Sequence, residues 1–363
     1  MPSSFPPASL PAALDPFLPS GHPLHTRTLS LEAFQEGADA VRVDGTILDL
    51  RKCGFVPTGG EIQTAGVIHH MHWRAWVEDP SGRIAKLEIA QPVVAMERGA
   101  ATGGECCRDP APRLQALVGT AFDPGFAKRL AGVFGGPLGC SHLLTLGQAL
   151  GAFVPRVLAD PRRAAEQRAR AERVAKRVLV LDGFERADGV LEIALQLADY
   201  RLAPHANVVE FLDRLTLARE VRLLGEVAAR DMQLLALRAA ARERDAGNLG
   251  APWRDLDAAV TPLAGDSALR GMAGRIRARL NELPPTEENG LLAEALLHFA
   301  PGLIQCMPAL SHRLGSFYAR AAASRAAASP PQDASNPLLT SGGFPDSCFM
   351  WRSGGATAAT RRG

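Results

Sequence analysis

The chain has 363 residues, of which 47% are hydrophobic, enough to bury the core of one large domain or of two ordinary ones. Its 40 basic and 38 acidic side chains give a net charge of +2, so composition provides no reason to expect nucleic acid or an anionic membrane as a partner. The apolar stretches fall short of the roughly 20 residues that cross a bilayer, and we recognise no secretory signal, so we expect a cytoplasmic protein with reduced cysteines and a small-molecule ligand.

The first 23 residues are rich in proline, which lacks an amide donor, so we expect residues 1–23 to form a disordered arm. Four segments follow in which apolar residues alternate with polar ones, a period that predicts antiparallel strands: HTRTLSLEAF, AVRVDGTILDLRK, VIHHMHWRAWVED and RIAKLEIAQPVV. Three later segments have apolar residues three and four apart, which predicts helices: PAPRLQALVG, DPGFAKRLAGVF and SHLLTLGQALGAFV. Residues 24–158 are therefore expected to form an α+β unit.

An internal repeat follows a charged segment. Residues 159–176 are alanine-rich and charged, which favours a solvated linker helix over an RNA-binding stripe. Beyond this segment, residues 177–201 align without a gap on residues 27–51. The repeat predicts two related halves, each a small antiparallel sheet followed by helices, packed as a pseudo-symmetric pair, with the second half over residues 177–305. The low-complexity residues 323–363 are expected to form a disordered tail.

The repeat also separates structural residues from candidate site residues. Asp49, Arg27 and Arg51 have identical counterparts in the second half, which favours a role in the shared fold. Cys140 and His142 have a threonine and a glutamate as their counterparts. Reactive side chains therefore belong to the first half alone, and the second half is expected to be a degenerate copy that supplies an interface.

Five residues of the first half carry nitrogen or sulfur donors that could converge: His69, Cys106, Cys107, Cys140 and His142. Strand alternation points His69 inward, and we expect it to meet Cys140, His142 and at least one of the paired cysteines. Thiolates and imidazoles are the ligands that zinc prefers. Alternatively, Cys140 is a nucleophile whose pKa is lowered by the amides at a helix start and by the nearby imidazole. The third interpretation is structural packing of all five side chains.

Four short motifs add a family resemblance. They are GTILD at residues 45–49, IHHM at 68–71, LVG at 117–119 and GCSHL at 139–143. Over residues 24–157 the chain resembles the bacterial family DUF2889, whose function is unknown. The resemblance implies that His69, Cys140 and His142 are site residues, together with Cys106 or Cys107, and it implies no particular reaction.

We therefore expect an enzyme of bacterial small-molecule metabolism with His69, Cys140 and His142 as catalytic residues. The five donor residues are the expected ligands if the site holds zinc. The glycines before Cys140 suggest no nucleotide site, because the turn has neither a Walker lysine nor the spacing of a dinucleotide loop. The alternative is a non-catalytic binding or scaffold protein in which the same residues pack a junction between strand and helix.

Overall fold

The alternating segments form long strands that join in one antiparallel sheet. The computed structural model describes residues 15–54, 56–58, 61–161, 163, 168–205, 211–310 and 346–359. Nine strands lie in the order β11-β10-β9-β8-β7-β1-β2-β5-β6. Their bounds are β1 (His22–Gln35), β2 (Ala40–Arg51), β5 (Gly66–Glu78), β6 (Ile84–Val93), β7 (Arg173–Glu185), β8 (Val190–Leu202), β9 (Leu215–Ala228), β10 (Leu234–Arg244) and β11 (Arg254–Asp255). A separate hairpin contains β3 (Val56–Thr58) and β4 (Glu61–Gln63).

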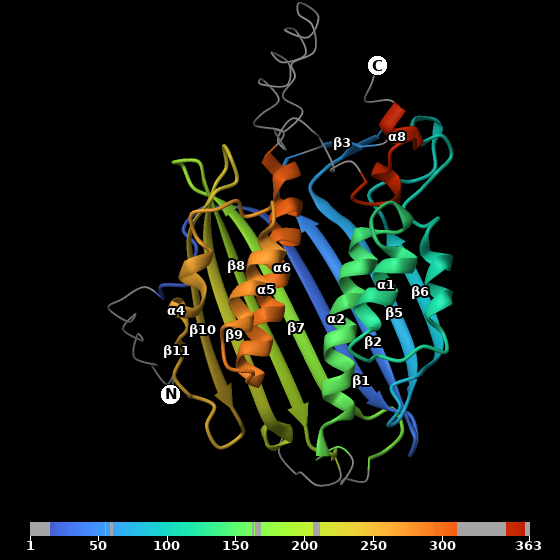
Figure 1. The fold of residues 1–363 in the computed structure, drawn as a ribbon, viewed down its shortest axis with the longest axis vertical. Helices are drawn as coiled ribbons and strands as arrows, with labels where there is room; N and C mark the ends of the chain where they lie inside the picture. The colour runs from blue at the N-terminus through green and yellow to red at the C-terminus, as the bar shows by residue number, and fades with distance from the viewer. Residues whose placement is uncertain are drawn as a thin grey trace, which may run out of the picture.

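Helices cover one face of this sheet (Figure 1). The described residues form six α-helices: α1 (Phe126–Phe134), α2 (Ser141–Leu158), α4 (Asp257–Val260), α5 (Met272–Asn281), α6 (Glu287–Leu310) and α8 (Ala356–Ala359). Short 3-10 helices are η1 (Ala100–Thr102), η2 (Ala111–Leu117), η3 (Gly136–Leu138), η5 (Phe211–Arg214), η6 (Thr261–Leu263) and η8 (Phe349–Trp351). Of these, η2 lies in the segment PAPRLQALVG, where the spacing predicts a helix, and it has 3-10 geometry. The long α2 packs on β1, β2 and β5, and α6 packs on β7, β8, β9 and β1.

The core lies between the sheet and the helices. Trp73 on β5 is fully buried there beneath α2. A Cβ atom at Gly147 of α2 would lie 2.8 Å from side-chain atoms of both Trp73 and Leu130, so a larger residue could not occupy this position without displacing them. The sequence of α2 therefore allows the helix to approach the sheet closely.

The two expected small sheets are instead one continuous sheet. Strands β1 and β7 pair antiparallel over almost their whole length, from His22 opposite Glu185 to Phe34 opposite Arg173. The prediction of a separate sheet in each half is wrong, because the first strands of the two halves use each other as neighbours. The result is a mixed α/β fold with one large sheet.

The predicted arm and tail are ordered in their described parts. The amides of Ser20 and Gly21 both donate to Glu192 at 2.8 Å, which fixes the chain just before β1. At the other end, the amide of Phe349 donates to the carbonyl of Gly139 at 2.7 Å. Disorder over all of residues 1–23 and 323–363 is therefore wrong. Residues 1–14, 323–345 and 360–363 of these predictions lie outside the described residues.

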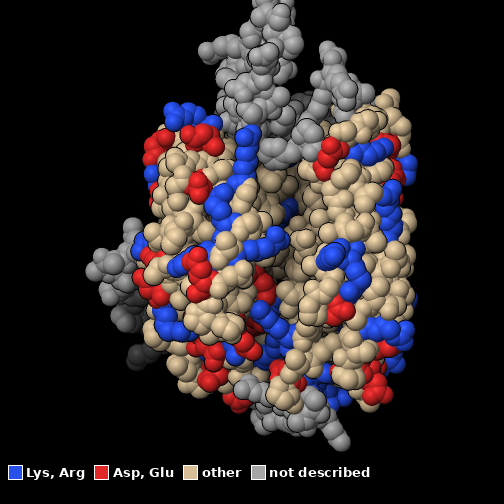
Figure 2. Space-filling view, viewed as in Figure 1, with Lys and Arg blue, Asp and Glu red and all other residues tan. Residues whose placement is uncertain are grey.

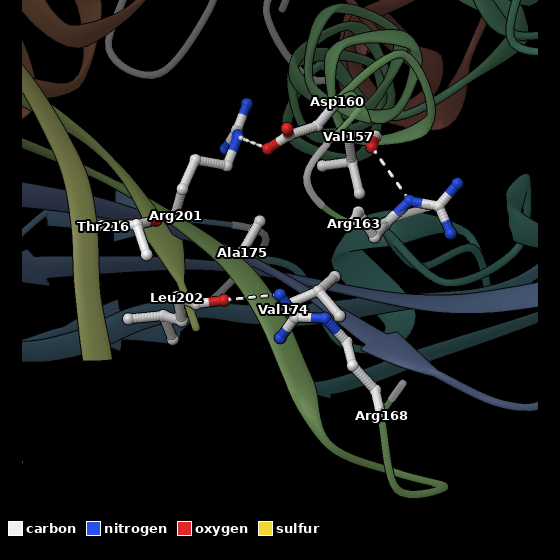
Figure 3. Close-up of a pocket in the computed structure, with 9 residues that line it drawn as sticks. All are labelled: Val157, Asp160, Arg163, Arg168, Val174, Ala175, Arg201, Leu202 and Thr216. Atoms are coloured by element: carbon white, nitrogen blue, oxygen red, sulfur yellow. Dashed lines mark hydrogen bonds and ion pairs between the residues drawn. The ribbon is translucent and has the colours of Figure 1, made fainter. Parts of the chain in front are cut away.

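The predicted linker helix over residues 159–176 does not extend to residue 176. Residues 173–176 belong to β7, and residues 162 and 164–167 lie outside the described part. A cavity of about 10 Å³ lies beside this connection, and Figure 3 shows the residues that line it. Arg163 donates to the carbonyl of Val157 at 3.1 Å, and Arg168 donates to that of Leu202 at 2.7 Å. The volume suits about one water molecule, so this cavity is too small for a substrate. Arg163 ties the connection to the first half, and Arg168 ties it to the second.

Among the described residues, α6 alone has the length and composition of a membrane span, with a mean hydropathy of 1.3 over 18 residues. It also contains Glu294, which forms ion pairs with Arg177 of the sheet and with Arg156 of α2. Charges of both signs are spread over the helical side of the molecule (Figure 2). The packing of α6 is therefore that of a core helix.

Candidate metal centre

Strand register places three polar side chains in a row beneath α2. Arg27 on β1 lies opposite Asp49 on β2, and Asp49 lies opposite His69 on β5. Residues directly opposite each other in antiparallel strands share one face of the sheet, and here that face is buried. His142, in the first turn of α2, lies against the same row. Three strands and one helix thus bring four side chains together.

Asp49 is held firmly as a carboxylate. It is fully buried, and the Nε and Nη2 atoms of Arg27 donate to its two oxygens at 2.8 and 2.9 Å. His25 Nε2 lies 2.9 Å from Asp49 Oδ1. Burial alone would raise the pKa of Asp49, but attraction to Arg27, followed by contacts with the His142, His25 and His69 imidazoles, brings that pKa well below its usual range. The carboxylate is therefore ionised and fixed in orientation.

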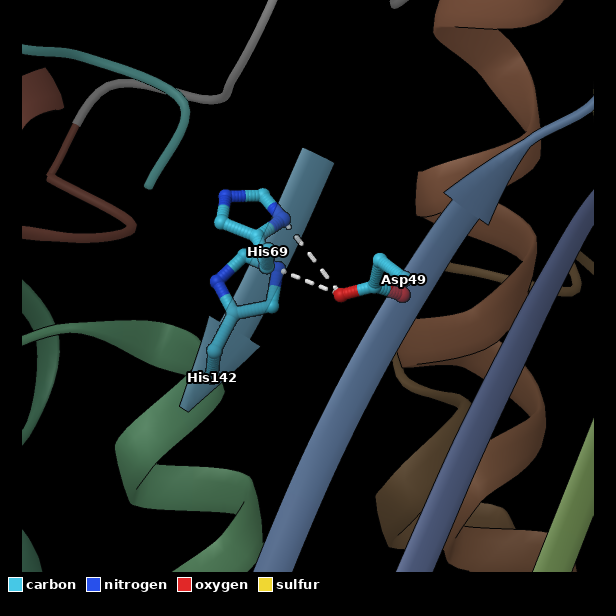
Figure 4. Close-up of side chains that lie close together, drawn as sticks. All are labelled: Asp49, His69 and His142. Atoms are coloured by element: carbon cyan, nitrogen blue, oxygen red, sulfur yellow. Dashed lines mark ion pairs between the residues drawn. The ribbon is translucent and has the colours of Figure 1, made fainter. Parts of the chain in front are cut away.

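The two imidazoles each present a nitrogen to Asp49 Oδ2 (Figure 4). His69 Nδ1 lies 3.4 Å from this oxygen and His142 Nε2 lies 3.3 Å from it, and within the described part of the chain neither nitrogen has a hydrogen-bond partner in good geometry. Two ligand atoms bound to one tetrahedral zinc at about 2.0–2.1 Å lie about 3.3 Å apart. The three ligand atoms all fall within 4.8 Å of one another, so this group could hold a metal ion.

Burial keeps His142 neutral. Burial and the neighbouring His69 ring, whose centroid lies 3.7 Å from that of His142, lower the pKa of His142 to about 3. A neutral imidazole retains the lone pair that a metal ion needs, whereas an imidazolium does not. At neutral pH, His142 is therefore in the form that binds metal.

Cys140 lies next to His142 but outside this group. It is the N-cap residue of α2, and its Sγ lies 3.8 Å from His142 Nδ1 and 3.9 Å from Met71 Sδ. Burial raises the pKa of Cys140 to about 12, although backbone amides at the helix start oppose the rise. The expected lowering of this pKa is wrong, because desolvation outweighs the helix amides. Cys140 is a neutral thiol at neutral pH.

The paired cysteines point to different places. Cys107 lines the cavity beside the imidazoles, and burial raises its pKa. Cys106 turns away and lies 3.3 Å from the carboxylate of Asp109. Of the five predicted ligands, the structure therefore brings His69 and His142 together with Asp49, and the cysteines lie outside this group.

Sequence reasoning did not identify Asp49 as a ligand, because the repeat pointed to a structural role. Asp49 ends the GTILD motif on a strand, and His69 lies on the same face of the strand beside it. An alternation argument applied to both strands together would have paired the two residues. Asp49 combines both roles, since Arg27 holds one edge of the carboxylate while Oδ2 faces the imidazoles.

The group opens onto a cavity of about 370 Å³, within the usual range for small-molecule sites. Polar side chains at its wall include Arg27, Arg51, His69 and His142. Most of the remaining wall is apolar and comes from the first half, from α6 and from the C-terminal segment around η8; it includes Met96, Leu144, Ile304, Phe349, Met350 and Trp351. The site is therefore completed by segments far apart in the chain.

Residues 25–154 match the model of a family described as protein of unknown function (DUF2889). No curated protein matches the chain, and no solved structure matches it. The matched region contains β1 to β6, α1 and most of α2, and therefore all three members of the metal-binding group. The match shows no second copy. The resemblance seen in the sequence motifs is confirmed over residues 25–154, where the first part of the chain matches the DUF2889 family model.

Proposed function

We propose that the protein is a metal-dependent enzyme of small-molecule metabolism, with zinc bound by Asp49, His69 and His142. The observation that carries this proposal is the spacing of 3.3 and 3.4 Å between the imidazole nitrogens and Asp49 Oδ2, in contacts without good hydrogen-bond geometry, beside a cavity. Imidazole and carboxylate donors suit zinc. Catalytic zinc sites typically have three protein ligands and leave a fourth position for water or substrate.

Each neighbouring side chain has a distinct role in this proposal. The metal would supply Lewis acidity and a more acidic bound water. Arg27 and His25 hold the Asp49 carboxylate in place, as outer-shell partners of metal ligands commonly do. Cys140 lies against His142 Nδ1 and so positions the ring with Nε2 toward Asp49. The apolar cavity wall excludes water around the substrate.

The first test is the zinc content of protein purified without a metal-binding tag. We expect about one zinc per chain in the parent, and loss of most of it in Asp49→Ala, His69→Ala and His142→Ala. His72→Ala is the matched control, because His72 lies on the same strand as His69 but on the opposite face, and its zinc content should equal the parent's. Equal zinc in all four variants would refute the ligand assignment.

Cobalt substitution separates a catalytic site from a structural one. If a coordination position is open, azide added to the cobalt-loaded protein should change its visible absorption spectrum, because the anion enters the metal's coordination shell. A spectrum that azide leaves unchanged would indicate a closed site and would favour the alternative, a non-catalytic binding or scaffold protein.

We also propose that the two halves arose by duplication. Arg177 and Asp199 pair at 2.9 Å, and their numbers exceed those of Arg27 and Asp49 by 150. In the second half, the residue opposite Asp199 on the next strand is Arg219, where the first half has His69. An arginine at this position cannot bind a metal ion. The second half would then supply an interface and a cavity wall in place of a second site.

A cytoplasmic location and a small-molecule substrate complete the proposal. All six cysteines are free thiols in the structure, as expected in a reducing compartment. The volume of the cavity, about 370 Å³, suits a small molecule.

A further inference from the structure

Arg51 is a buried cation at the cavity wall without an anionic partner. Its side chain lines the cavity and the residue is 5% exposed. Among the described residues its side chain makes one hydrogen bond, a donation from Nη1 to the carbonyl of Gln63 at 3.2 Å, and Nε has no hydrogen-bond partner. Within the described ranges, no carboxylate forms an ion pair with Arg51. Arginine is always charged at physiological pH, so burial without a counter-ion is costly.

Two other buried arginines of the sheet are paired with carboxylates, which offsets the cost of burying their charge. Arg27 shares both oxygens of Asp49, as described above. Arg201, which occupies the equivalent position to Arg51 in the second half, lies 2.8 Å from Asp199 and 3.5 Å from Asp160. The oxygens of Asp49 contact Arg27, His25 and the two imidazoles of the metal-binding group, so this carboxylate does not neutralise Arg51. The charge of Arg51 is therefore available to a ligand.

We propose that the cavity binds a small organic acid with an apolar body, whose carboxylate pairs with Arg51. The planar guanidinium matches a carboxylate in two parallel hydrogen bonds. Arg27, the other arginine at the wall, is already paired with Asp49. Arg51 therefore fits one carboxylate with a hydrocarbon or aromatic body, since Met96, Ile304 and Trp351 also line the cavity. This inference rests on the proposed function, because it takes the cavity as the substrate site.

The spacing along β2 separates the carboxylate of the bound ligand from the part of the ligand that would react. Arg51 follows Asp49 by two residues on the same face of β2, so their Cα atoms lie about 7 Å apart along the strand. Both Arg51 and His142 line the same cavity. A ligand held at Arg51 would therefore extend toward the metal-binding group with a different part of its structure, and the carboxylate would serve for recognition and not for reaction.

The test compares an acid with its uncharged amide. We would titrate the zinc-loaded full chain with 3-phenylpropionate and with 3-phenylpropanamide and measure both dissociation constants by calorimetry. The acid should bind at least tenfold more tightly than the amide. In Arg51→Met this preference should fall to about onefold, with amide binding unchanged. Arg51→Lys should retain part of the preference, and the exposed Arg113→Met should retain all of it.

Zinc content and circular dichroism measured on the same samples separate this inference from the metal assignment. Arg51→Met should keep the parent's zinc and fold, because no buried carboxylate loses its partner. An acid preference that survives in Arg51→Met would place the carboxylate on the metal and overturn the role of Arg51. Equal or undetectable binding of acid and amide by the parent would overturn the ligand class, whatever its zinc content.

Discussion

At the scale of single residues, Asp49 organises the site because it accepts contacts on both of its oxygens. Arg27 and His25 approach one edge of the carboxylate, and the two imidazoles approach Oδ2. Burial without Arg27 would favour the protonated acid, which is a poor metal ligand. The ion pair with Arg27 therefore keeps the carboxylate available to a metal.

Cys140 should tune metal affinity without being required for binding. Its Sγ contacts His142 Nδ1 at 3.8 Å, on the far side of the ring from Asp49. Loss of such an outer contact typically weakens metal binding by about 10- to 100-fold. We expect Cys140→Ala to retain one zinc at saturation with a dissociation constant raised about tenfold, as measured by competition with a chelator. Complete loss of zinc at saturation would make Cys140 a ligand.

His298 of α6 should make stability depend on pH. Burial, followed by the charges of Arg27 and Arg177, lowers the pKa of His298 to about 4. Below pH 6.5 the unfolded chain binds a proton that the folded chain does not, so His298 destabilises the fold progressively as the pH falls from 6.5 toward 4. The effect is limited to about 1.4 kcal/mol per pH unit.

The variant His298→Gln removes this titration. Relative to the parent, it should gain about 1 kcal/mol of unfolding free energy between pH 7 and pH 5.5, measured by urea denaturation at both values. A parent and a variant that lose stability in parallel over this range would show that His298 is protonated equally in the folded and unfolded states.

At the scale of elements, the turn before α2 sets the position of His142. Gly139 precedes Cys140, and a Cβ atom there would lie 2.2 Å from the carbonyl oxygen of Phe134 and 2.5 Å from its ring. A side chain at residue 139 must therefore push the start of α2 away from α1. Because His142 lies in the first turn of α2, such a shift would also move Nε2 away from Asp49.

Gly139→Ala should therefore destabilise the fold by about 1–3 kcal/mol, the usual cost of overpacking, and should lower zinc content as well. Gly132→Ala is the matched control in α1, because a Cβ atom there meets nothing within 4 Å. Alanine in a helix interior should stabilise by up to about 1 kcal/mol. Thermal denaturation and zinc analysis of both variants check these outcomes, and equal stability of the two would refute the steric argument.

The strands β2 and β5 contribute their site residues through register. Asp49 meets His69 because these two positions lie opposite each other, on the face that α2 covers. A register slip of one residue would turn each side chain to the other face of the sheet. Apolar residues two positions away on the same face, such as Ile47 and Met71, are fully buried and prevent this slip. The same hydrophobic pattern therefore fixes both the core and the site.

At the scale of the whole molecule, the continuous sheet makes the two halves depend on each other. The longest part of the junction is the β1–β7 pair, and α6 of the second half supplies Pro301, Ile304 and Gln305 to the cavity wall. A chain ending at residue 160 would leave unpaired the backbone donors and acceptors on the β7 side of β1, and it would uncover apolar surface. Such an edge is a template for pairing with another chain.

We expect the chain ending at residue 160 to dimerise or aggregate, as measured by size-exclusion chromatography with light scattering. The full chain is its reference under the same conditions. A stable monomer with normal zinc content would show that the first half folds independently, and the interface role of the second half would then be refuted.

Much of the secondary structure follows from the periodicity of the sequence. Alternation identifies the first four long strands because one face of each is buried, and the three- and four-residue spacing identifies α1 and α2. Proline content misleads at the start of the chain, since Ser20 and Gly21 are fixed by a carboxylate more than 170 residues away. A contact of that length has no local signature in the sequence.

The sequence by itself determined which residue types are present and which face of each strand is buried, because periodicity is a local property. It therefore placed His69 inward and singled out His142. Only the tertiary structure decided that Asp49 joins them, that the cysteines lie outside the group, and that Arg51 faces a cavity closed by residues near 349 and 304. The physical reason is that strand pairing and helix docking bring distant segments together, and burial then sets which charges are compensated and which remain for a ligand.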